Sequence, residues 1–297
     1  MSQEDACSKL CLGTVQMGQK YGVANALGRQ PLPQESFSVL QAALDKGISY
    51  FDTASIYGTS EEVIGAFHLA GRHDTHIISK LPPETEDSEK AVLDEVRKTL
   101  SRLQADRIDG YLLHDARDME RQGIVRGLCK AKEKGLVGSI GVSVYEPRDA
   151  YYAVSVSWVD YVQIPYNVLD QRLDEADFFY QAKKYGVKVF ARSLFLQGLL
   201  AMDLDNLPNT LLEARSLLEK FQSISDGHGF TRKEAALLYG LEHPGIDYVV
   251  FGVDTLSQLE ENLQIAKRLG EFKACYEALH GAFRDVDRKI INPSLWR

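Results

Sequence analysis

One local pattern recurs along this chain: an amphipathic stretch, a single glycine and then a short apolar run. It occurs in DKGISYFD, EKGLVGSIG and KYGVKVFA, where Gly47, Gly135 and Gly186 separate the two parts. A glycine at this place is typical of a helix that ends in the left-handed conformation shortly before a strand begins. The recurrence predicts a chain built from repeated strand–helix units.

Eight apolar runs have the character of strands, and most are almost continuous in Val, Ile, Leu, Phe and Tyr, as strands covered on both faces tend to be. They span residues 10–15, 49–54, 76–81, 109–115, 138–144, 160–167, 187–194 and 247–253. Amphipathic helical patterns lie between them. The alternation predicts an α/β protein with a (β/α)8 TIM barrel. A doubly wound open sheet is the alternative, but its usual Gly-x-Gly-x-x-Gly turn is absent after the first run.

We expect one barrel domain over residues 1–297, because no linker-like change in composition interrupts the chain. α/β barrels of this length routinely form single domains. The longest interruption, 203–230, falls between the seventh and eighth predicted strands. It is expected to hold a substrate loop and a helix.

Charge and composition exclude several classes of function. Lys and Arg total 34 against 42 Asp and Glu, a net charge of −8, which argues against nucleic-acid binding by phosphate neutralisation. No apolar run approaches the roughly 18 residues of a membrane span, and the start is acidic where a secretory signal is basic. The four cysteines include no Cys-x-x-Cys pair. We expect a cytoplasmic protein with no membrane, nucleic-acid or metal partner.

Four polar residues follow consecutive predicted strands, at the rim where the carboxyl ends of barrel strands meet. Asp52 ends the second strand, Tyr57 lies in the loop after it, Lys80 is near the end of the third strand, and His114 is near the end of the fourth. Each alone has an ordinary structural interpretation, as a turn residue, a loop aromatic, a surface lysine and a core histidine. Their shared rim is what indicates a site.

These side chains suit the reduction of a carbonyl group. A phenol has a pKa of about 10, and a nearby ammonium group lowers that pKa by stabilising the phenolate. A carboxylate keeps the ammonium group charged and oriented, while a neutral imidazole can donate a hydrogen bond to a carbonyl oxygen. The set predicts protonation of a carbonyl oxygen while hydride reaches its carbon. Because no side chain supplies hydride, a nicotinamide cofactor is expected.

The segments GISYFDTASIYG, ISKLPP and YLLHD resemble the aldo-keto reductase superfamily. The resemblance continues through GLVGSIGVSVY, DYVQIPYNVLD and LSQLEENL, and so covers most of the chain in the right order. It implies a barrel that reduces an aldehyde or ketone with NADP(H), with NAD(H) as the alternative. It assigns Tyr57 as the general acid, Lys80 and Asp52 as the pair that tunes it, and His114 as the residue that orients the carbonyl.

The same resemblance implies a set of cofactor-binding residues. It matches Ser143 and Gln163 to positions that hold the nicotinamide carboxamide, and Glu261 and Asn262 to an adenine-binding pair. The other implied residues are Arg192, Ser193, Gly252, Asp254 and Gln258.

Two of these depart from common family patterns, and a third has an equally good structural explanation. Arg192 stands where many relatives have an aromatic side chain that stacks on the nicotinamide, although a guanidinium group can also stack. Asp254 lies where relatives that prefer NADPH often have Lys or Arg, and it would repel a phosphate if it pointed inward. Gln258 is explained equally well as the capping partner of Thr255.

The sequence indicates less about the substrate than about the type of reaction. The segment SLFLQGLL resembles bacterial family members linked to sugar genes, and polar mouth residues would suit a hydroxylated carbonyl compound. Residues expected in or near the mouth, besides Tyr57, are Tyr21, Ile56, Tyr145, Tyr166, Phe195 and Gln197. The alternatives to a reductase are a nucleotide-binding regulatory or accessory subunit on the same scaffold, and a Schiff-base aldolase that uses Lys80. The complete set of four rim residues favours the reductase.

Overall fold

The computed structural model describes residues 7–23, 25, 27–69, 71, 75–175 and 177–296. Its strands are parallel and close into a barrel in sequence order, with the first strand paired to the eighth. The strands are β1 (Leu10–Gly13), β2 (Tyr50–Asp52), β3 (His76–Leu81), β4 (Ile108–Leu113), β5 (Val137–Ser143), β6 (Tyr161–Pro165), β7 (Lys188–Arg192) and β8 (Tyr248–Gly252). The closed order confirms the (β/α)8 barrel and excludes the open sheet.

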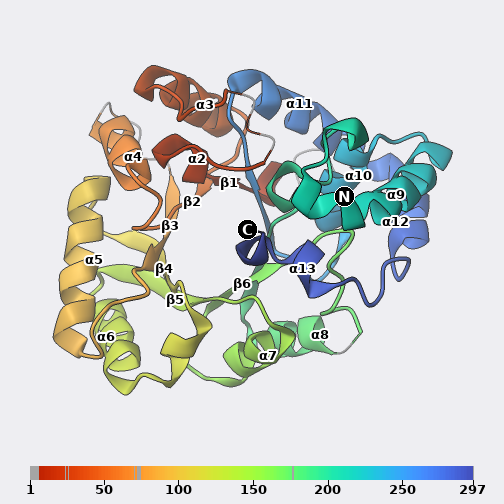
Figure 1. The fold of residues 1–297 in the computed structure, drawn as a ribbon. Helices are drawn as coiled ribbons and strands as arrows, with labels where there is room; N and C mark the ends of the chain where they lie inside the picture. The colour runs from red at the N-terminus through yellow and green to blue at the C-terminus, as the bar shows by residue number, and fades with distance from the viewer. Residues whose placement is uncertain are drawn as a thin grey trace.

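Helices surround the strands as an outer layer (Figure 1). The α-helices are α2 (Val15–Gly18), α3 (Pro33–Asp45), α4 (Ser60–Leu69), α5 (Glu89–Leu103), α6 (Gln122–Glu133), α7 (Pro147–Ser155), α8 (Phe178–Tyr185), α9 (Arg215–Gly227), α10 (Arg232–Glu242), α11 (Leu256–Ala266), α12 (Lys273–Leu279) and α13 (Arg288–Ile291). Short 3-10 helices are η1 (Ala116–Glu120), η2 (Leu196–Gly198), η3 (Leu204–Asn206), η4 (Asn209–Ala214), η5 (Leu269–Glu271) and η6 (Pro293–Leu295). No helix in the described part of the chain has the length and apolar character needed to cross a membrane.

Gly47, Gly135 and Gly186 occupy the helix–strand joins that the recurring pattern predicts. All three adopt positive φ angles, of 83°, 71° and 72° respectively. Gly186 is the left-handed C-cap of α8 and comes two residues before β7. These joins turn the chain from the outer helices back into the barrel.

Apolar side chains fill the inside of the barrel on the amino-terminal side of the predicted site. A cluster of buried residues gathers there from several strands: Cys11, Ile78, Leu112, Tyr161, Phe190 and Val250. Because side chains alternate along a strand, Ile78 and Lys80 lie on the same face of β3. Lys80 therefore points into the barrel above an apolar layer, and its exposed fraction is 0%.

The connection between β7 and β8 contains the expected helix, since η3, η4 and α9 occupy most of residues 203–230.

Helices α4 and α5 pack with their backbones in direct contact at Gly65. A Cβ atom at this position would overlap the carbonyl oxygen of Arg102. The first turn of α4 contacts the ends of β1 and β2, so this packing also supports the rim of the barrel.

We predict that Gly65→Ala lowers the free energy of unfolding by about 1–3 kcal/mol, the usual effect of overpacking. Urea denaturation measures the change. Gly227→Ala is the matched control, because a Cβ atom at Gly227 would have no neighbour within 4 Å. Equal stability of the two variants would contradict the packing argument.

Candidate active site

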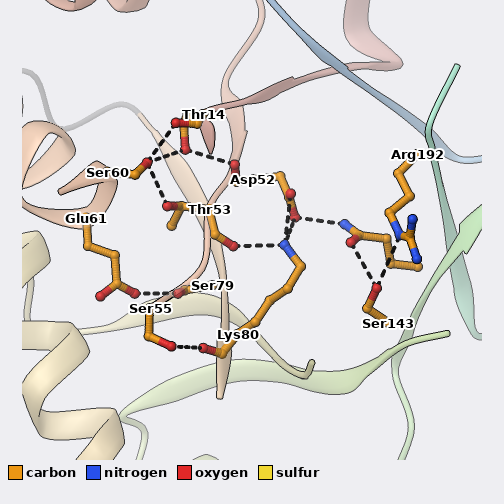
Figure 2. Close-up of polar contacts among 11 residues, drawn as sticks. Thr14, Asp52, Thr53, Ser55, Ser60, Glu61, Ser79, Lys80, Ser143 and Arg192 are labelled. Carbon is orange, nitrogen blue, oxygen red and sulfur yellow. Dashed lines mark hydrogen bonds and ion pairs between the residues drawn. The ribbon is translucent and has the colours of Figure 1, made fainter. Parts of the chain in front are cut away.

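A buried ion pair lies at the centre of the carboxyl rim (Figure 2). Lys80 Nζ is 2.7 Å from Asp52 Oδ1 and 2.9 Å from Asp52 Oδ2, and it also donates to the carbonyl oxygen of Thr53 at 2.8 Å. Burial alone would lower the pKa of Lys80, but the Asp52 carboxylate and Tyr57 together offset this and hold that pKa above its usual value. The ammonium group therefore stays charged.

Hydrogen bonds extend from this ion pair across the rim to β7. Gln163 Nε2 donates to Asp52 Oδ1 at 2.7 Å, and Ser143 Oγ donates to Gln163 Oε1 at 3.3 Å. Arg192 Nε in turn donates to Ser143 Oγ at 3.3 Å. Residues far apart in the sequence thus form one connected network.

Three hydroxyl groups fix the end of β2, and their role is not evident from the sequence. Thr14 Oγ1 donates to the carbonyl oxygen of Asp52 at 3.0 Å, and Ser60 Oγ donates to the carbonyl oxygen of Thr14 at 2.9 Å. Thr53 Oγ1 donates to Ser60 Oγ at 2.9 Å. Ser60 is the first residue of α4. This network ties β1, β2 and α4 together behind the ion pair.

Tyr57 and His114 complete the cluster. Lys80 Nζ is 5.2 Å from the centroid of the Tyr57 ring, and the Tyr57 and His114 rings meet edge to face with centroids 5.8 Å apart. The Tyr57 loop packs closely on α2, because a Cβ atom at Gly18 would overlap the carbonyl oxygen of Tyr57. Gly58, with a φ of 55°, makes the reciprocal backbone contact with Gly18.

The ionisation of these two rings follows from burial. Burial raises the pKa of Tyr57 above its usual value, even though the Lys80 ammonium group acts to lower it. Lys80 thus acts on this pKa in the expected direction, but desolvation of the phenolate is the larger effect, and the net shift is upward. Burial also lowers the pKa of His114 to about 3, with a further contribution from the Lys80 charge. At neutral pH the phenol is protonated and the imidazole is neutral.

A cleft of about 370 Å³ opens above this cluster. Most of the predicted site residues line it: Asp52, Tyr57, His114, Ser143, Arg192, Ser193, Gly252, Asp254, Gln258 and Asn262. Lys80 and Gln163 are both 0% exposed and act on the cleft through Asp52. Glu261 does not line the cleft, and its half-exposed side chain pairs with Lys233 at 2.5 Å.

Several polar atoms around the cleft are buried and have no hydrogen-bond partner among the described residues. These atoms are Gln16 Oε1, Asn25 Oδ1, His114 Nδ1 and Asn262 Oδ1. An unpaired buried polar atom is costly, so such a set indicates a polar ligand that supplies hydrogen bonds along the cleft. The hydroxyl and amino groups of a nicotinamide dinucleotide fit this requirement.

The sequence analysis missed Gln16, Asn25 and Lys233, which also line the cleft. Asn25 Nδ2 donates to Asp254 Oδ1 at 2.9 Å, so the carboxylate is part of the cleft wall. Lys233 is in the first turn of α10, and nothing in a single sequence distinguishes it from a solvated surface lysine.

Gln258 takes part in the cap at the start of α11, although its side chain bonds to Asp254 rather than to Thr255. Thr255 caps α11 through the backbone N–H of Gln258, while Gln258 Oε1 accepts from the backbone N–H of Asp254 at 2.7 Å. The glutamine thus bonds to the residue before the cap.

The expected mouth residues separate into two groups. Tyr21, Tyr145, Phe195 and Gln197 line the cleft. The expectation is wrong for Tyr166, which is fully buried and donates to Asp174 Oδ2 at 2.9 Å, because its ring packs on Tyr239 of α10 and not into the cleft.

Ile56 is 49% exposed and lies outside the lining of the cleft. In the β7–β8 connection, residues between 193 and 202 line the cleft, as does Lys233, whereas no residue of 203–230 does, so the expected substrate loop precedes 203–230. No group of three or more metal-ligating side chains comes together within the described ranges.

The closed parallel barrel, with a polar cleft and a buried ion pair at its carboxyl rim, defines a TIM-barrel protein with a site suited to redox chemistry. The Aldo/keto reductase family model matches residues 9–274, and the chain belongs to this family.

Known relatives agree with this assignment. The chain is 26% identical over 260 residues to "Uncharacterized oxidoreductase YqkF" of Bacillus subtilis (strain 168), covering 80% of this chain and 84% of that protein. It is 27% identical over 312 residues to a D-threo-aldose 1-dehydrogenase of a Pseudomonas species, covering 89% and 93%. The solved aldo-keto reductase AKR11C1 from Bacillus halodurans, in its holo form, has the same fold with a TM-score of 0.72, 22% identity and coverage of 90% and 91%. The protein is therefore an oxidoreductase of this family.

We predict that the His114 imidazole does not titrate between pH 5 and 8. Its pKa in the folded protein is about 3, whereas an unfolded histidine has a pKa near 6.5. Its contribution to the free energy of unfolding is therefore complete above about pH 6.5 and falls as the pH decreases towards 3. Proton NMR spectra compared between the protein and His114→Gln identify the resonance.

The control for this measurement is His228→Gln, which removes an exposed imidazole after α9. It should leave the His114 resonance in place. A His114 resonance that titrates with a midpoint near 6.5 would contradict the buried, neutral imidazole.

Proposed function

We propose that the protein is an NAD(P)H-dependent oxidoreductase that reduces an aldehyde or ketone to an alcohol, with Tyr57 as the general acid. The observation that carries the proposal is the meeting of the Tyr57 phenol, the Lys80 ammonium group and the His114 imidazole beneath one cleft. The unpaired polar atoms along that cleft support a dinucleotide ligand.

Each group has a distinct part in this proposal. The bound nicotinamide supplies the hydride. Tyr57, protonated because burial raises its pKa, gives its proton to the carbonyl oxygen, and Lys80 stabilises the phenolate that remains. His114, neutral at working pH, donates a hydrogen bond that orients the carbonyl. Asp52 holds Lys80 in place, and Ser143, which lines the cleft and is positioned by Gln163, would hold the nicotinamide carboxamide.

The substrate we propose is hydroxylated, with a sugar-related aldehyde as the leading class. The catalytic half of the cleft, meaning the part around Tyr57 and His114, also presents Tyr21, Tyr145 and Gln197, whose polar groups suit a hydroxylated compound. The similarity to a protein named for aldose dehydrogenation supports the same class.

The sequence favours NADP(H) by resemblance, but the cleft offers support for NAD(H). Asp254 is 7% exposed, lines the cleft and contacts Asn25, so its carboxylate would repel a 2′-phosphate and could accept from a ribose hydroxyl. Lys233, a cation in the same lining, is engaged by Glu261. Asp254 is thus the residue on which the choice of nucleotide depends.

We expect Tyr57→Phe to reduce turnover by roughly 10²–10⁴, the usual effect of losing a general acid. Nucleotide affinity should change less than about threefold, because the ring remains in place. Steady-state assays of NAD(P)H oxidation with an aldehyde panel, together with nucleotide titrations, measure both quantities.

The control Tyr180→Phe alters a 66% exposed phenol on α8 and should leave turnover unchanged. Near-normal turnover of Tyr57→Phe would refute the assignment of the acid. Tight nucleotide binding by the unaltered protein without turnover across the panel would instead favour a regulatory subunit.

We expect Asp254→Asn to improve the affinity for NADPH relative to NADH by about tenfold, because it removes a negative charge from the cleft wall. Isothermal titration calorimetry with both nucleotides gives the ratio. Asp106→Asn is the matched control, since Asp106 is exposed and precedes β4 at the opposite end of the barrel. An unchanged ratio in Asp254→Asn would place the 2′ position of the ribose elsewhere.

A further inference from the structure

The guanidinium group of Arg192 lies in the catalytic half of the cleft and is held rigidly there. Its Nε donates to Ser143 Oγ at 3.3 Å, Nη1 to Ser193 Oγ at 3.1 Å and Nη2 to the carbonyl oxygen of Val144 at 3.0 Å. Its Cζ atom is 4.1 Å from the centroid of the Tyr145 ring. All of these partners are neutral.

Arg192 therefore differs from the other cations near the rim. Lys80 is paired with Asp52, and Arg172 is paired with Asp170 at 2.7 Å. Within the described part of the chain, Arg192 has no carboxylate within ion-pair distance. The catalytic half of the cleft thus carries one positive charge that no ion pair neutralises.

The charge of Arg192 also reaches the reacting groups. Burial is the main cause of the low pKa of His114, about 3, and the charges of Lys80 and Arg192 act in the same direction. Arg192 likewise acts with Lys80 to lower the pKa of Tyr57 against the larger effect of burial. A charge introduced by a ligand in this half of the cleft would experience the same field.

The two redox forms of a nicotinamide differ by such a charge, since the reduced ring is neutral and the oxidised ring is a cation. We propose that Arg192 makes the cleft bind the reduced nucleotide more tightly than the oxidised one, and so favours loading of the protein with the reduced form. This inference rests on the proposed nucleotide-dependent function.

The consequence concerns loading and release. In a mixed nucleotide pool the protein fills with the reduced form, and repulsion by Arg192 speeds release of the oxidised form. The same charge opposes the positive charge that develops on the nicotinamide ring during hydride transfer. Arg192 would therefore favour binding of the reduced form and release of the oxidised form, and would not favour the hydride transfer itself. A guanidinium group is suited to this because it stays protonated at every working pH.

The test compares dissociation constants for NADPH, NADP⁺, NADH and NAD⁺, measured by calorimetry and by the fluorescence of the reduced forms. We expect the unaltered protein to have a ratio of oxidised to reduced dissociation constants well above one. Arg192→Gln should lower that ratio by about tenfold, within the range of a partly screened charge pair. Arg192→Lys should keep the ratio within about threefold, because it retains the positive charge.

Arg117→Gln is the matched control, since it removes one positive charge from a side chain that is 88% exposed on η1. Its ratio should stay within about twofold of that of the unaltered protein. An unchanged ratio in Arg192→Gln, or equal ratios in Arg192→Gln and Arg192→Lys, would overturn the inference. If Arg192→Gln does not fold, a ratio at or below one in the unaltered protein is by itself enough to overturn the inference.

Failure of the proposed function is distinguishable from failure of this inference. If neither form of either nucleotide binds the unaltered protein, the proposed function falls and the inference falls with it. If both forms bind equally well, only the role of Arg192 is refuted.

Discussion

The buried pair of Lys80 and Asp52 is the interaction on which the rest of the site depends. Two charges at 0% and 4% exposure are costly to remove from water, and removing one partner of such a pair typically costs about 3–5 kcal/mol. A hydrophobic pair of similar volume would stabilise the barrel at least as well. The pair is therefore better explained by its position, since it holds an ammonium group beneath the Tyr57 ring and anchors the hydrogen bonds that reach Arg192.

The parallel register of the strands places further polar residues next to this ion pair and so builds the site. Ser143 at the end of β5 lies beside Gln163 of β6, and Gln163 reaches across the barrel to Asp52 at the end of β2. Closure of the barrel brings β2 and β6 within reach of one amide side chain, which an open sheet would not do. The rim thus joins separate strand ends into one connected polar surface, and this surface lies beneath the cleft.

How much the sequence predicts depends on whether a feature is local. The strands, the glycine joins and the cap at Thr255 could be predicted because short-range pattern and backbone conformation determine them. The positions of Lys80 and His114 at the rim followed from strand ends. The net ionisation of Tyr57 could not be predicted, because it is a balance between burial and a charge that only the assembled barrel sets.

The loops limited the prediction most, because their part in the site also depends on contacts that exist only in the assembled barrel. Asn25 and Lys233 join the cleft wall from the β1 loop and from α10, and no pattern near either residue indicates a ligand. The sequence identifies Arg192 and Asp254 as departures from a family pattern. The effect of their charges on a ligand can be judged only when the residues around them are known. Asp254 contacts the amide of Asn25, and the hydrogen-bond partners of Arg192 are neutral groups, so it is the assembled structure that places both side chains in the cleft wall. The common barrel positions the rim residues, and charged side chains in the cleft wall, such as Arg192 and Asp254, are where we propose that this protein sets its choice of nucleotide.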